Sequence, residues 1–183
     1  RFQITTKCAL LSTSSRYFNT VMNMNRGLKT YSAIGIGTGV KSTVQVSKHQ
    51  VTTDLPRLLG GHDESAQPVE LLLSALIGCE TATAAYVSRK MKPRLDIERL
   101  RFEYFAERDD LGSLQLPIDK DPDVDSKLKR IYGSVNVKVK DGLIKDGSRL
   151  ELLKNQVDKR CPIASMIKQS GCIMDVEWKF IDE

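Results

Sequence analysis

Residues 60–79 of the chain read GGHDESAQPVELLLSALIGC, and the organisation of the whole domain can be worked out from this stretch. Its first half combines two glycines with polar and charged residues, which is typical of a loop. A proline follows at position 68, where proline favours the first turn of a helix. Side chains then recur at spacings of four, three, four and three at Leu72, Leu76, Cys79, Thr83 and Tyr86. This period predicts one buried face of a helix over 68–89, about 33 Å long at 1.5 Å per residue.

Shorter elements are expected on both sides of this long helix. Alternating or β-branched segments predict strands at 30–36, 42–47, 49–54, 100–104, 135–139 and 174–180. Two further helices are expected at 149–159 and from Cys161-Pro162 onward, whereas the Asp-rich segment 109–130 is expected to be a surface loop or a short helix. The order of these expected strands and helices along the chain predicts an α+β domain, in which an antiparallel sheet packs around a long central helix.

The net charge of +5 is unevenly distributed along the chain. Residues 1–53 hold seven basic and no acidic side chains, whereas residues 54–183 hold 21 basic and 23 acidic ones, a net charge of −2. A mildly acidic domain argues against nucleic acid as a partner. The acid-free, Ser- and Arg-containing residues 1–30 are typical of a mitochondrial transit peptide, which predicts localisation to the mitochondrial matrix; an ordinary polar tail is the alternative. The domain itself is expected to span 31–183.

Several other classes of protein are disfavoured by composition. The longest apolar stretch, Leu71 to Cys79, is far shorter than the roughly 20 residues of a membrane span, so the chain is not expected to be transmembrane. Four cysteines without C-x-x-C spacing indicate neither a disulfide scaffold nor a zinc site. The two histidines, His49 and His62, have no cysteine at ligand spacing, and we expect no metal and no other cofactor.

Two of the cysteines occupy positions where chemistry is plausible. Cys79 is predicted in the middle of the long helix, on its buried face. Cys161 directly precedes Pro162, which predicts a helix N-cap, where free N–H groups and the helix dipole favour a thiolate. A buried cysteine is more often just a small apolar side chain, so a purely structural role remains the alternative for each.

The segment 60–79, with its glycine-containing loop, P-x-E-L-L and a small residue before Cys79, resembles the first signature of the OsmC/Ohr family. The segment 158–163, DKRCPI, resembles the second signature, a charged helix end followed by Cys-Pro and an aliphatic residue. The resemblance covers about 31–180. It implies an intertwined homodimer, with two sheets around paired central helices and the two cysteines facing each other near the subunit interface.

The resemblance also implies an activity. Characterised members of the family are thiol peroxidases that reduce organic hydroperoxides. Carried over to this chain, Cys79 would attack the peroxide and become a sulfenic acid, and Cys161 would condense with it to a disulfide. A dithiol reductant would then reopen the disulfide.

One departure from the family pattern concerns the groups that activate the first cysteine. The peroxidase branches carry a glutamate ten residues before that cysteine, paired with an arginine from the turn after the first strand. Here position 69 is valine, and Glu70 is displaced by about 100° around the helix. No arginine lies in 27–56, so only Lys41 in the turn, or Arg160, could supply positive charge. Without these partners, burial is expected to hold Cys79 as an inert thiol.

Two hypotheses about function follow. The first is an OsmC-like thiol peroxidase of the less characterised P-x-E branch, acting on organic or lipid hydroperoxides. The second is a non-catalytic subunit with the OsmC fold, a scaffold in a larger mitochondrial assembly. The missing activating groups favour the second hypothesis, and the retained pair of cysteines favours the first.

Overall fold

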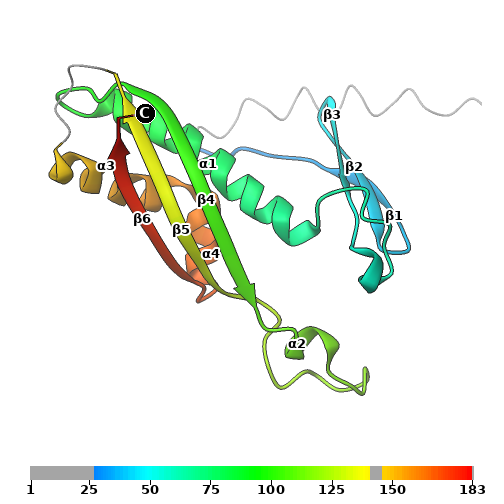
Figure 1. Ribbon diagram of the computed structural model, residues 1–183. Coiled ribbons are helices and arrows are strands. Elements are labelled where there is room, and N and C mark those ends of the chain that lie inside the picture. The colour runs from blue at the N-terminus through cyan, green and yellow to red at the C-terminus, as the bar shows by residue number, and fades with distance from the viewer. Residues whose placement is uncertain (1–26, 141–145, 183) are drawn as a thin grey trace, which may run out of the picture.

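The computed structural model describes residues 27–140 and 146–182 (Figure 1), so the predicted leader lies almost entirely outside the described residues. The elements are, in chain order, β1 (Ile34–Thr38), β2 (Lys41–Val46), β3 (His49–Thr53), the 3-10 turn η1 (Arg57–Leu59), α1 (Pro68–Lys90), β4 (Ile97–Arg108), α2 (Leu111–Leu114), β5 (Leu128–Val139), α3 (Gly147–Arg160), α4 (Pro162–Gln169) and β6 (Ile173–Ile181). The predicted α+β class is confirmed, and every predicted strand and helix is present.

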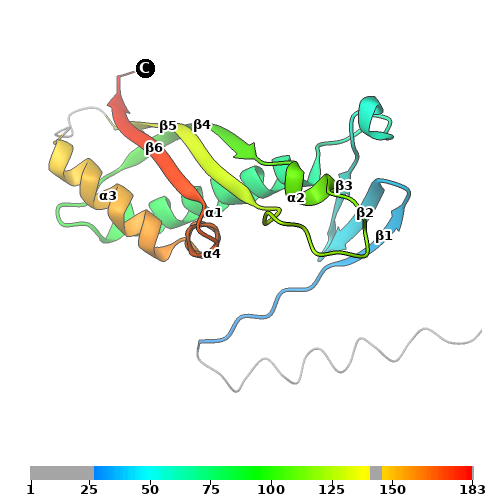
Figure 2. The same cartoon turned by 90° about the horizontal axis from the view of Figure 1, so that it is seen from below.

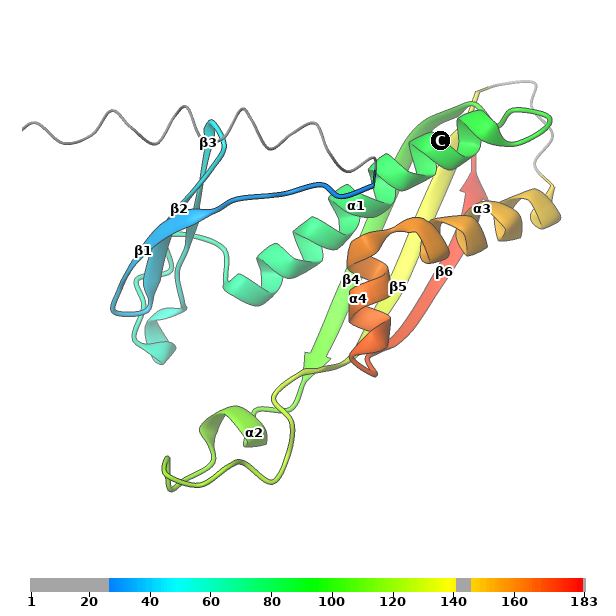
Figure 3. The same cartoon turned by 180° about the vertical axis from the view of Figure 1, so that it is seen from behind.

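The main sheet has the strand order β4-β5-β6. The long strands β4 and β5 pair antiparallel, as expected, but β5 and β6 pair parallel. The two helices α3 and α4 connect β5 to β6, and they carry the chain back along the sheet before β6 begins (Figure 3). Parallel pairing requires such a crossover, which a list of strands in sequence order does not reveal.

Helices α1, α3 and α4 all lie against one face of the main sheet (Figure 2). Two clusters of buried side chains fill the space between the layers. The larger one joins α1 and α3 to the sheet and includes Trp178. The smaller one, at the α4 end, contains Leu76, Ile131, Cys161, Ala164, Ile167 and Cys172. The cysteines of interest therefore belong to the second, smaller cluster.

The N-terminal sheet, β1-β2-β3, stands apart from this core, beyond the N-terminal end of α1 (Figure 1). All five residues of β1 are exposed. Within the described residues, none of the buried hydrophobic side chains of the core comes from these three strands. A small sheet that is only partly covered and holds no fully buried apolar side chain lacks the hydrophobic support that such sheets need.

The start of α1 is held by local hydrogen bonds. Gln67 and Glu70 form a reciprocal capping box, and Pro68 occupies the first turn. In the preceding loop the fully buried Asp54 carboxylate accepts backbone N–H groups of Leu55, at 2.8 Å, and of His62, at 3.1 Å. Burial alone would raise the pKa of Asp54, but its backbone N–H donors outweigh that effect and lower the pKa. The signature loop is thus organised around one buried acid.

The buried face of α1 differs from the predicted one. Leu76 is buried as expected, but Leu72 and Tyr86 are 38% and 51% exposed. The residues of α1 that are buried are Leu76, Glu80, Ala84, Val87 and Ser88. Because small or apolar side chains occur on most sides of this helix, periodicity alone could not decide which stripe packs against the rest of the chain.

By length and hydropathy, α1 is also the one described helix that would be able to cross a membrane. The core helix of a folded domain meets the same criteria. In this fold α1 packs against α3, α4 and β4, as a helix of the domain core does.

The segment between β4 and β5 is longer than a simple hairpin turn and contains α2 (Figure 1). It was expected to extend to residue 130, but β5 already begins at Leu128. The single helical turn α2 presents exposed Leu111 and Leu114, and exposed Leu116 and Ile118 follow. This insertion therefore combines an acidic composition with a row of exposed apolar side chains.

Gly133 in β5 has a backbone φ of 141°, and a Cβ added there would lie 1.9 Å from the carbonyl oxygen of Glu103 on β4. We therefore expect Gly133→Ala to lower the free energy of unfolding by at least about 2 kcal/mol. Urea unfolding followed by circular dichroism measures this loss. Gly147→Ala is the matched control, because nothing lies within 4 Å of a Cβ there. Equal stabilities of the two variants would contradict the prediction.

Candidate functional site

The two cysteines singled out from the sequence meet inside the smaller core cluster. Cys79 lies in the middle of α1, and Cys161 lies at the junction of α3 and α4. Their Sγ atoms are 2.8 Å apart although the residues are 82 positions apart in the chain. Both are free thiols, Cys161 fully buried and Cys79 partly exposed. The pair can therefore form a disulfide with only a small movement of the side chains.

The position of Cys161 follows from how two helices join. Its backbone N–H donates to the carbonyl of Val157 at 2.8 Å and so ends α3, while its Sγ accepts the N–H of Ala164 at 3.4 Å and so begins α4. Pro162 supports the change of direction because it cannot continue α3 but fits the first turn of α4. The predicted N-cap role of Cys161 is thus present, and it fixes the direction of the thiol.

The expectation that this N-cap makes Cys161 a thiolate is wrong. Burial, and after it the hydrogen bond to Cys79, raise the pKa of Cys161 to about 12. The backbone N–H groups of Ala164 and Ile163 act in the opposite direction but are outweighed. Cys161 is therefore a neutral thiol, and its S–H is directed to Cys79.

The three supporting residues suggested by the sequence have other partners. Lys41 forms an ion pair with Glu64, Glu70 accepts the backbone N–H of Gln67 at 2.7 Å, and Arg160 donates to Gln156 at 2.9 Å. Within the described residues, none of the three bonds to either cysteine sulfur. The structure brings together Cys79 and Cys161 but not Lys41, Glu70 or Arg160.

A buried acid that the sequence analysis did not select adjoins this pair. Glu80 is only 1% exposed, and the hydroxyl of Tyr104 on β4 donates a hydrogen bond to its Oε2. Burial raises the pKa of Glu80 to about 7, although the bond from Tyr104 acts to lower it. Burial and the carboxyl group together raise the pKa of Tyr104 as well. The only signal in the sequence was a charged residue placed within an apolar helix.

This raised pKa predicts a pH-dependent stability. Between the ordinary value of 4.5 and about 7, folded Glu80 binds more proton than the unfolded chain does, so the free energy of unfolding falls as pH rises. The loss across this window is on the order of 3 kcal/mol. Urea unfolding of the wild type and of Glu80→Gln at pH 5 and pH 8 measures it, because the variant lacks the titrating group. Glu70→Gln is the control on the same helix, and it should keep the wild-type pH dependence. Parallel pH profiles of wild type and Glu80→Gln would contradict the prediction.

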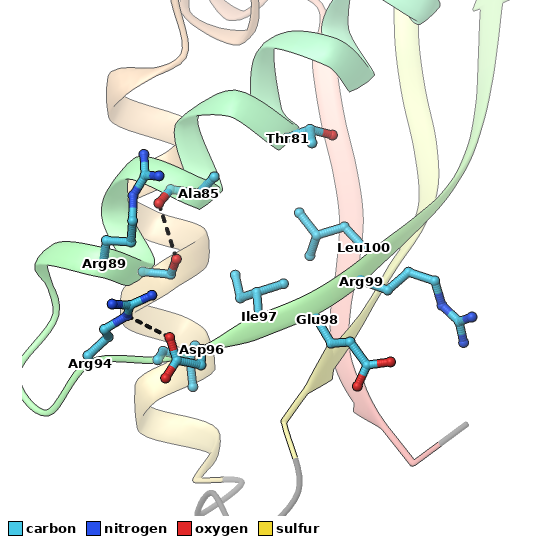
Figure 4. A pocket seen from close by; sticks show the side chains of 11 residues that line it. Thr81, Ala85, Arg89, Arg94, Asp96, Ile97, Glu98, Arg99 and Leu100 are labelled. Atoms are coloured by element: carbon cyan, nitrogen blue, oxygen red, sulfur yellow. Dashed lines mark hydrogen bonds and ion pairs between the residues drawn. The ribbon is translucent and has the colours of Figure 1, made fainter.

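A cavity of about 320 Å³ lies between the C-terminal half of α1 and the start of β4 (Figure 4). Arg89 and Arg94 lie near one another at its side, and Arg94 pairs with Asp96 at 2.5 Å. Ile97 and Leu100 provide apolar lining. Neither cysteine lines this cavity, so it does not give access to the sulfur pair.

No cluster of His, Cys, Asp and Glu that could hold a metal ion occurs within residues 27–140 and 146–182. Two adjacent thiols, one of them partly exposed, can reduce an electrophile and store the oxidation as a disulfide.

Comparisons with known proteins agree with this fold. A family model described as OsmC-like protein matches residues 61–177, more than half of the chain. The fold is similar to that of an OsmC-like protein from Mycoplasma pneumoniae (TM-score 0.65, 20% identity), with coverage of 84% of this chain and 99% of that one. It is also similar to an organic hydroperoxide resistance protein OsmC from Legionella pneumophila (TM-score 0.61, 17% identity), with coverage of 84% and 99%.

A third similar structure is an OsmC-like protein of unknown function from Vibrio cholerae (TM-score 0.64, 13% identity), with coverage of 84% of this chain and all of that one. No curated protein sequence gave a significant match. The structural similarities, all at low identity, concern the fold, while the family model matches the sequence across the segment that holds Cys79 and Cys161. The chain therefore belongs to the OsmC-like protein family.

Proposed function

We propose that this protein is a thiol peroxidase that reduces organic or lipid hydroperoxides, with Cys79 as the peroxidatic and Cys161 as the resolving cysteine. The observation that supports this most strongly is the 2.8 Å distance between the two sulfurs. The partly exposed Cys79 can be reached by a peroxide, whereas Cys161 is buried. Burial holds Cys161 as a neutral thiol, which suits it less for the first attack on a peroxide.

The proposed cycle has three balanced steps. The Cys79 thiolate attacks one peroxide oxygen; an S–O bond forms, the O–O bond breaks, and the alcohol leaves after taking up a proton. The Cys161 thiol then attacks the sulfenic acid; an S–S bond forms, the S–O bond breaks, and water leaves. Finally a dithiol reductant attacks the disulfide, restores both thiols and is itself oxidised to a disulfide.

Mixing the reduced protein with one equivalent of cumene hydroperoxide tests this proposal directly. We expect one peroxide to be consumed and two thiols to be lost per chain, with a Cys79–Cys161 disulfide found by mass spectrometry of the digested protein. Hydrogen peroxide serves as the comparison substrate, because an enzyme for organic hydroperoxides should react with it more slowly. Peroxide that remains unconsumed would overturn the proposal.

The departures at Val69 and in the arginine-free segment 27–56 bear on the branch of the family. We propose that the chain belongs to the less characterised P-x-E branch, in which Cys79 is not activated by the glutamate–arginine pair. The S–H of Cys161 and the partial exposure of Cys79 would then replace that pair.

We propose further that the protein is a homodimer. The N-terminal sheet leaves Ile34 and Ile36 almost fully exposed, and α1 leaves Leu72 and Tyr86 partly exposed. A second copy that covers both surfaces would supply the apolar contacts that the single chain lacks. Light scattering during gel filtration should give twice the chain mass of 20.5 kDa. Tyr86→Glu should shift the mass to that of one chain, whereas Leu114→Glu on the insertion should not; a wild-type monomer would contradict the proposal.

A second candidate function, the scaffold subunit, is favoured by the insertion between β4 and β5. Its side chains Leu111, Leu114, Leu116 and Ile118 are 56–84% exposed. Such a row of apolar side chains is typical of a protein interface. If the chain is a scaffold, native gels of mitochondrial extract should show it in a large complex that Ile118→Asp disrupts and Cys79→Ser preserves. Migration as a free dimer would contradict this function.

We propose that residues 1–30, which contain no acid, direct import into the matrix. A fusion of residues 1–30 to a fluorescent protein should enter mitochondria, and a fusion carrying Arg16→Glu and Arg26→Glu should stay outside. Import of both fusions, or of neither, would contradict the proposal.

A further inference from the structure

The charge of the domain is separated along the main sheet. Residues 89–101, from the last turn of α1 into β4, hold six basic and two acidic side chains, a net charge of +4. Residues 103–125, from β4 into the insertion, hold two basic and eight acidic side chains, a net charge of −6. The ends of β4, a strand of 12 residues, lie roughly 37 Å apart. Because ions screen charge over about 8 Å at physiological ionic strength, the acidic end does not neutralise the basic one.

Basic residues from other elements join residues 89–101 where β5 ends and α3 begins, at the end of the molecule remote from the insertion (Figures 1 and 3). Lys138 of β5 pairs with Glu98 at 3.2 Å. Arg149 of α3 donates a hydrogen bond to the backbone carbonyl of Pro93 at 2.6 Å. Residues 89–101 together with Lys138 and Arg149 are called the basic end below.

Much of the charge at the basic end has no acidic partner in the protein. The two acids of residues 89–101 are both paired, Asp96 with Arg94 at 2.5 Å and Glu98 with Lys138. Four exposed basic side chains form no ion pair within the described residues, namely Arg89, Lys90, Lys92 and Arg101. The basic end therefore presents positive charge to solvent.

Local structure explains only part of this charge. Basic side chains in the last turn of a helix stabilise its C-terminus, which accounts for Arg89 and Lys90 of α1. Arg101 lies beyond that helix. Arg99 of β4 lies directly opposite Lys138 of β5, and like charges in such positions repel one another.

The cavity of about 320 Å³ between α1 and β4 lies at the basic end (Figure 4). Arginine and aliphatic side chains both line it, namely Arg89, Arg94, Arg99, Leu95, Ile97 and Leu100. Cavities that hold small ligands have volumes of about 300–1,000 Å³, so this one is large enough for a headgroup. Guanidinium groups beside aliphatic side chains suit a phosphate that is linked to hydrocarbon.

We propose that the basic end docks on a membrane that contains anionic phospholipids, with one lipid phosphate held by the arginines of this cavity. Negatively charged membrane surfaces attract clusters of exposed Lys and Arg side chains. The separation of charge orients the protein, with the basic end towards the membrane and the acidic insertion away from it. This proposal does not depend on the peroxidase proposal, because neither cysteine lines the cavity.

Single-stranded nucleic acid is the other polyanion that a basic surface could bind. Proteins that bind it combine positive charge with aromatic side chains on which the bases stack. No aromatic side chain lines this cavity, whose apolar part is aliphatic. The lining therefore favours a phospholipid over a nucleic acid.

Sedimentation of the 183-residue chain with lipid vesicles tests the proposal. We expect binding to vesicles of equal parts phosphatidylcholine and phosphatidylserine, weaker as the salt concentration rises, and no binding to phosphatidylcholine alone. In Arg89→Gln/Lys92→Gln the dissociation constant should rise roughly 25-fold, because each basic side chain near an anionic surface contributes about fivefold. Lys48→Gln/Arg57→Gln is the matched control, because it removes the same charge from exposed sites near the N-terminal sheet and should bind as wild type does.

A second pair of variants tests the cavity without a change of charge. Ala85 and Ala82 are both exposed on α1, but only Ala85 lines the cavity. Ala85→Phe should fill the cavity and weaken vesicle binding, whereas Ala82→Phe should not. Unchanged binding of Ala85→Phe would overturn the placement of a lipid phosphate in this cavity.

Three other results would overturn the proposal as a whole. The first is equal vesicle binding by the wild type and Arg89→Gln/Lys92→Gln. The second is a loss of binding only in Arg16→Gln/Arg26→Gln, which would assign the binding to the basic leader. The third is tighter binding of single-stranded polyuridine than of the anionic vesicles, which would identify nucleic acid as the ligand of the basic end.

Discussion

Replacing Cys79 with serine is expected to lower the rate of organic hydroperoxide reduction at least about 1,000-fold, because a serine hydroxyl is a far weaker nucleophile than a thiolate. The structure predicts this asymmetry between the two cysteines. Cys79 is the more exposed sulfur and accepts the S–H of Cys161. Peroxide consumption coupled to a dithiol reductant measures the rate under multiple turnovers.

Substitutions of the other two described cysteines, Cys161 and Cys172, test whether the loss of activity is specific to Cys79. Cys161→Ser should still consume one equivalent of peroxide and accumulate the Cys79 sulfenic acid, since only the resolving thiol is missing. Cys172→Ser is the matched control, because Cys172 is a buried free cysteine of the same core cluster and bonds only weakly to a backbone carbonyl, at 3.8 Å. Full activity of Cys79→Ser, or its loss in Cys172→Ser, would reject Cys79 as the nucleophile.

Oxidation of the Cys79–Cys161 pair is expected to raise the free energy of unfolding by about 4 kcal/mol. The disulfide would join residues 82 positions apart and so remove conformational freedom from the unfolded chain. In the folded chain the sulfurs are already close, so little native strain opposes this gain. For a domain of this size, the midpoint of thermal unfolding should rise by about 10 °C.

Differential scanning calorimetry of the protein oxidised by cumene hydroperoxide and of the protein kept in dithiothreitol measures the difference. Cys161→Ser should unfold at the same temperature under both conditions, because it cannot form the bond. An oxidised wild type no more stable than the reduced one would contradict the prediction. The result would also show whether the redox state of this pair can regulate the lifetime of the protein in the cell.

Much of the fold was predictable because the local signals are strong. Pro68 at the start of α1 and the alternating valines of β5 reflect backbone preferences and side-chain periodicity, which act within a few residues. The N-cap position of Cys161 was predictable for the same reason, since Pro162 can begin a helix but not continue one. The relative direction of the strands was not predictable. The parallel pairing of β5 with β6 depends on the path of the two helices between them.

The candidate site also has features that the sequence predicts and features that only the folded chain shows. Cys79 and Cys161 were identified from short motifs, but their contact across 82 positions exists only in the folded chain. Glu80 was not selected, because a single charged residue in a helix is usually exposed. The expectation of a thiolate at Cys161 failed because it considered the helix N-terminus but not the burial that outweighs it.

The sequence by itself determined the class of the fold, its family signatures, the identity of the two cysteines and the absence of acidic residues from positions 1–53. Secondary-structure propensity, helix capping and charge composition depend on neighbouring residues only, so they can be predicted from the sequence. Only the tertiary structure decided which stripe of α1 is buried, which partners Lys41, Glu70 and Arg160 have, and how strongly burial acts on Cys161. These depend on burial and on distances between residues remote in sequence, and desolvation acts on a side chain only once other elements have closed around it.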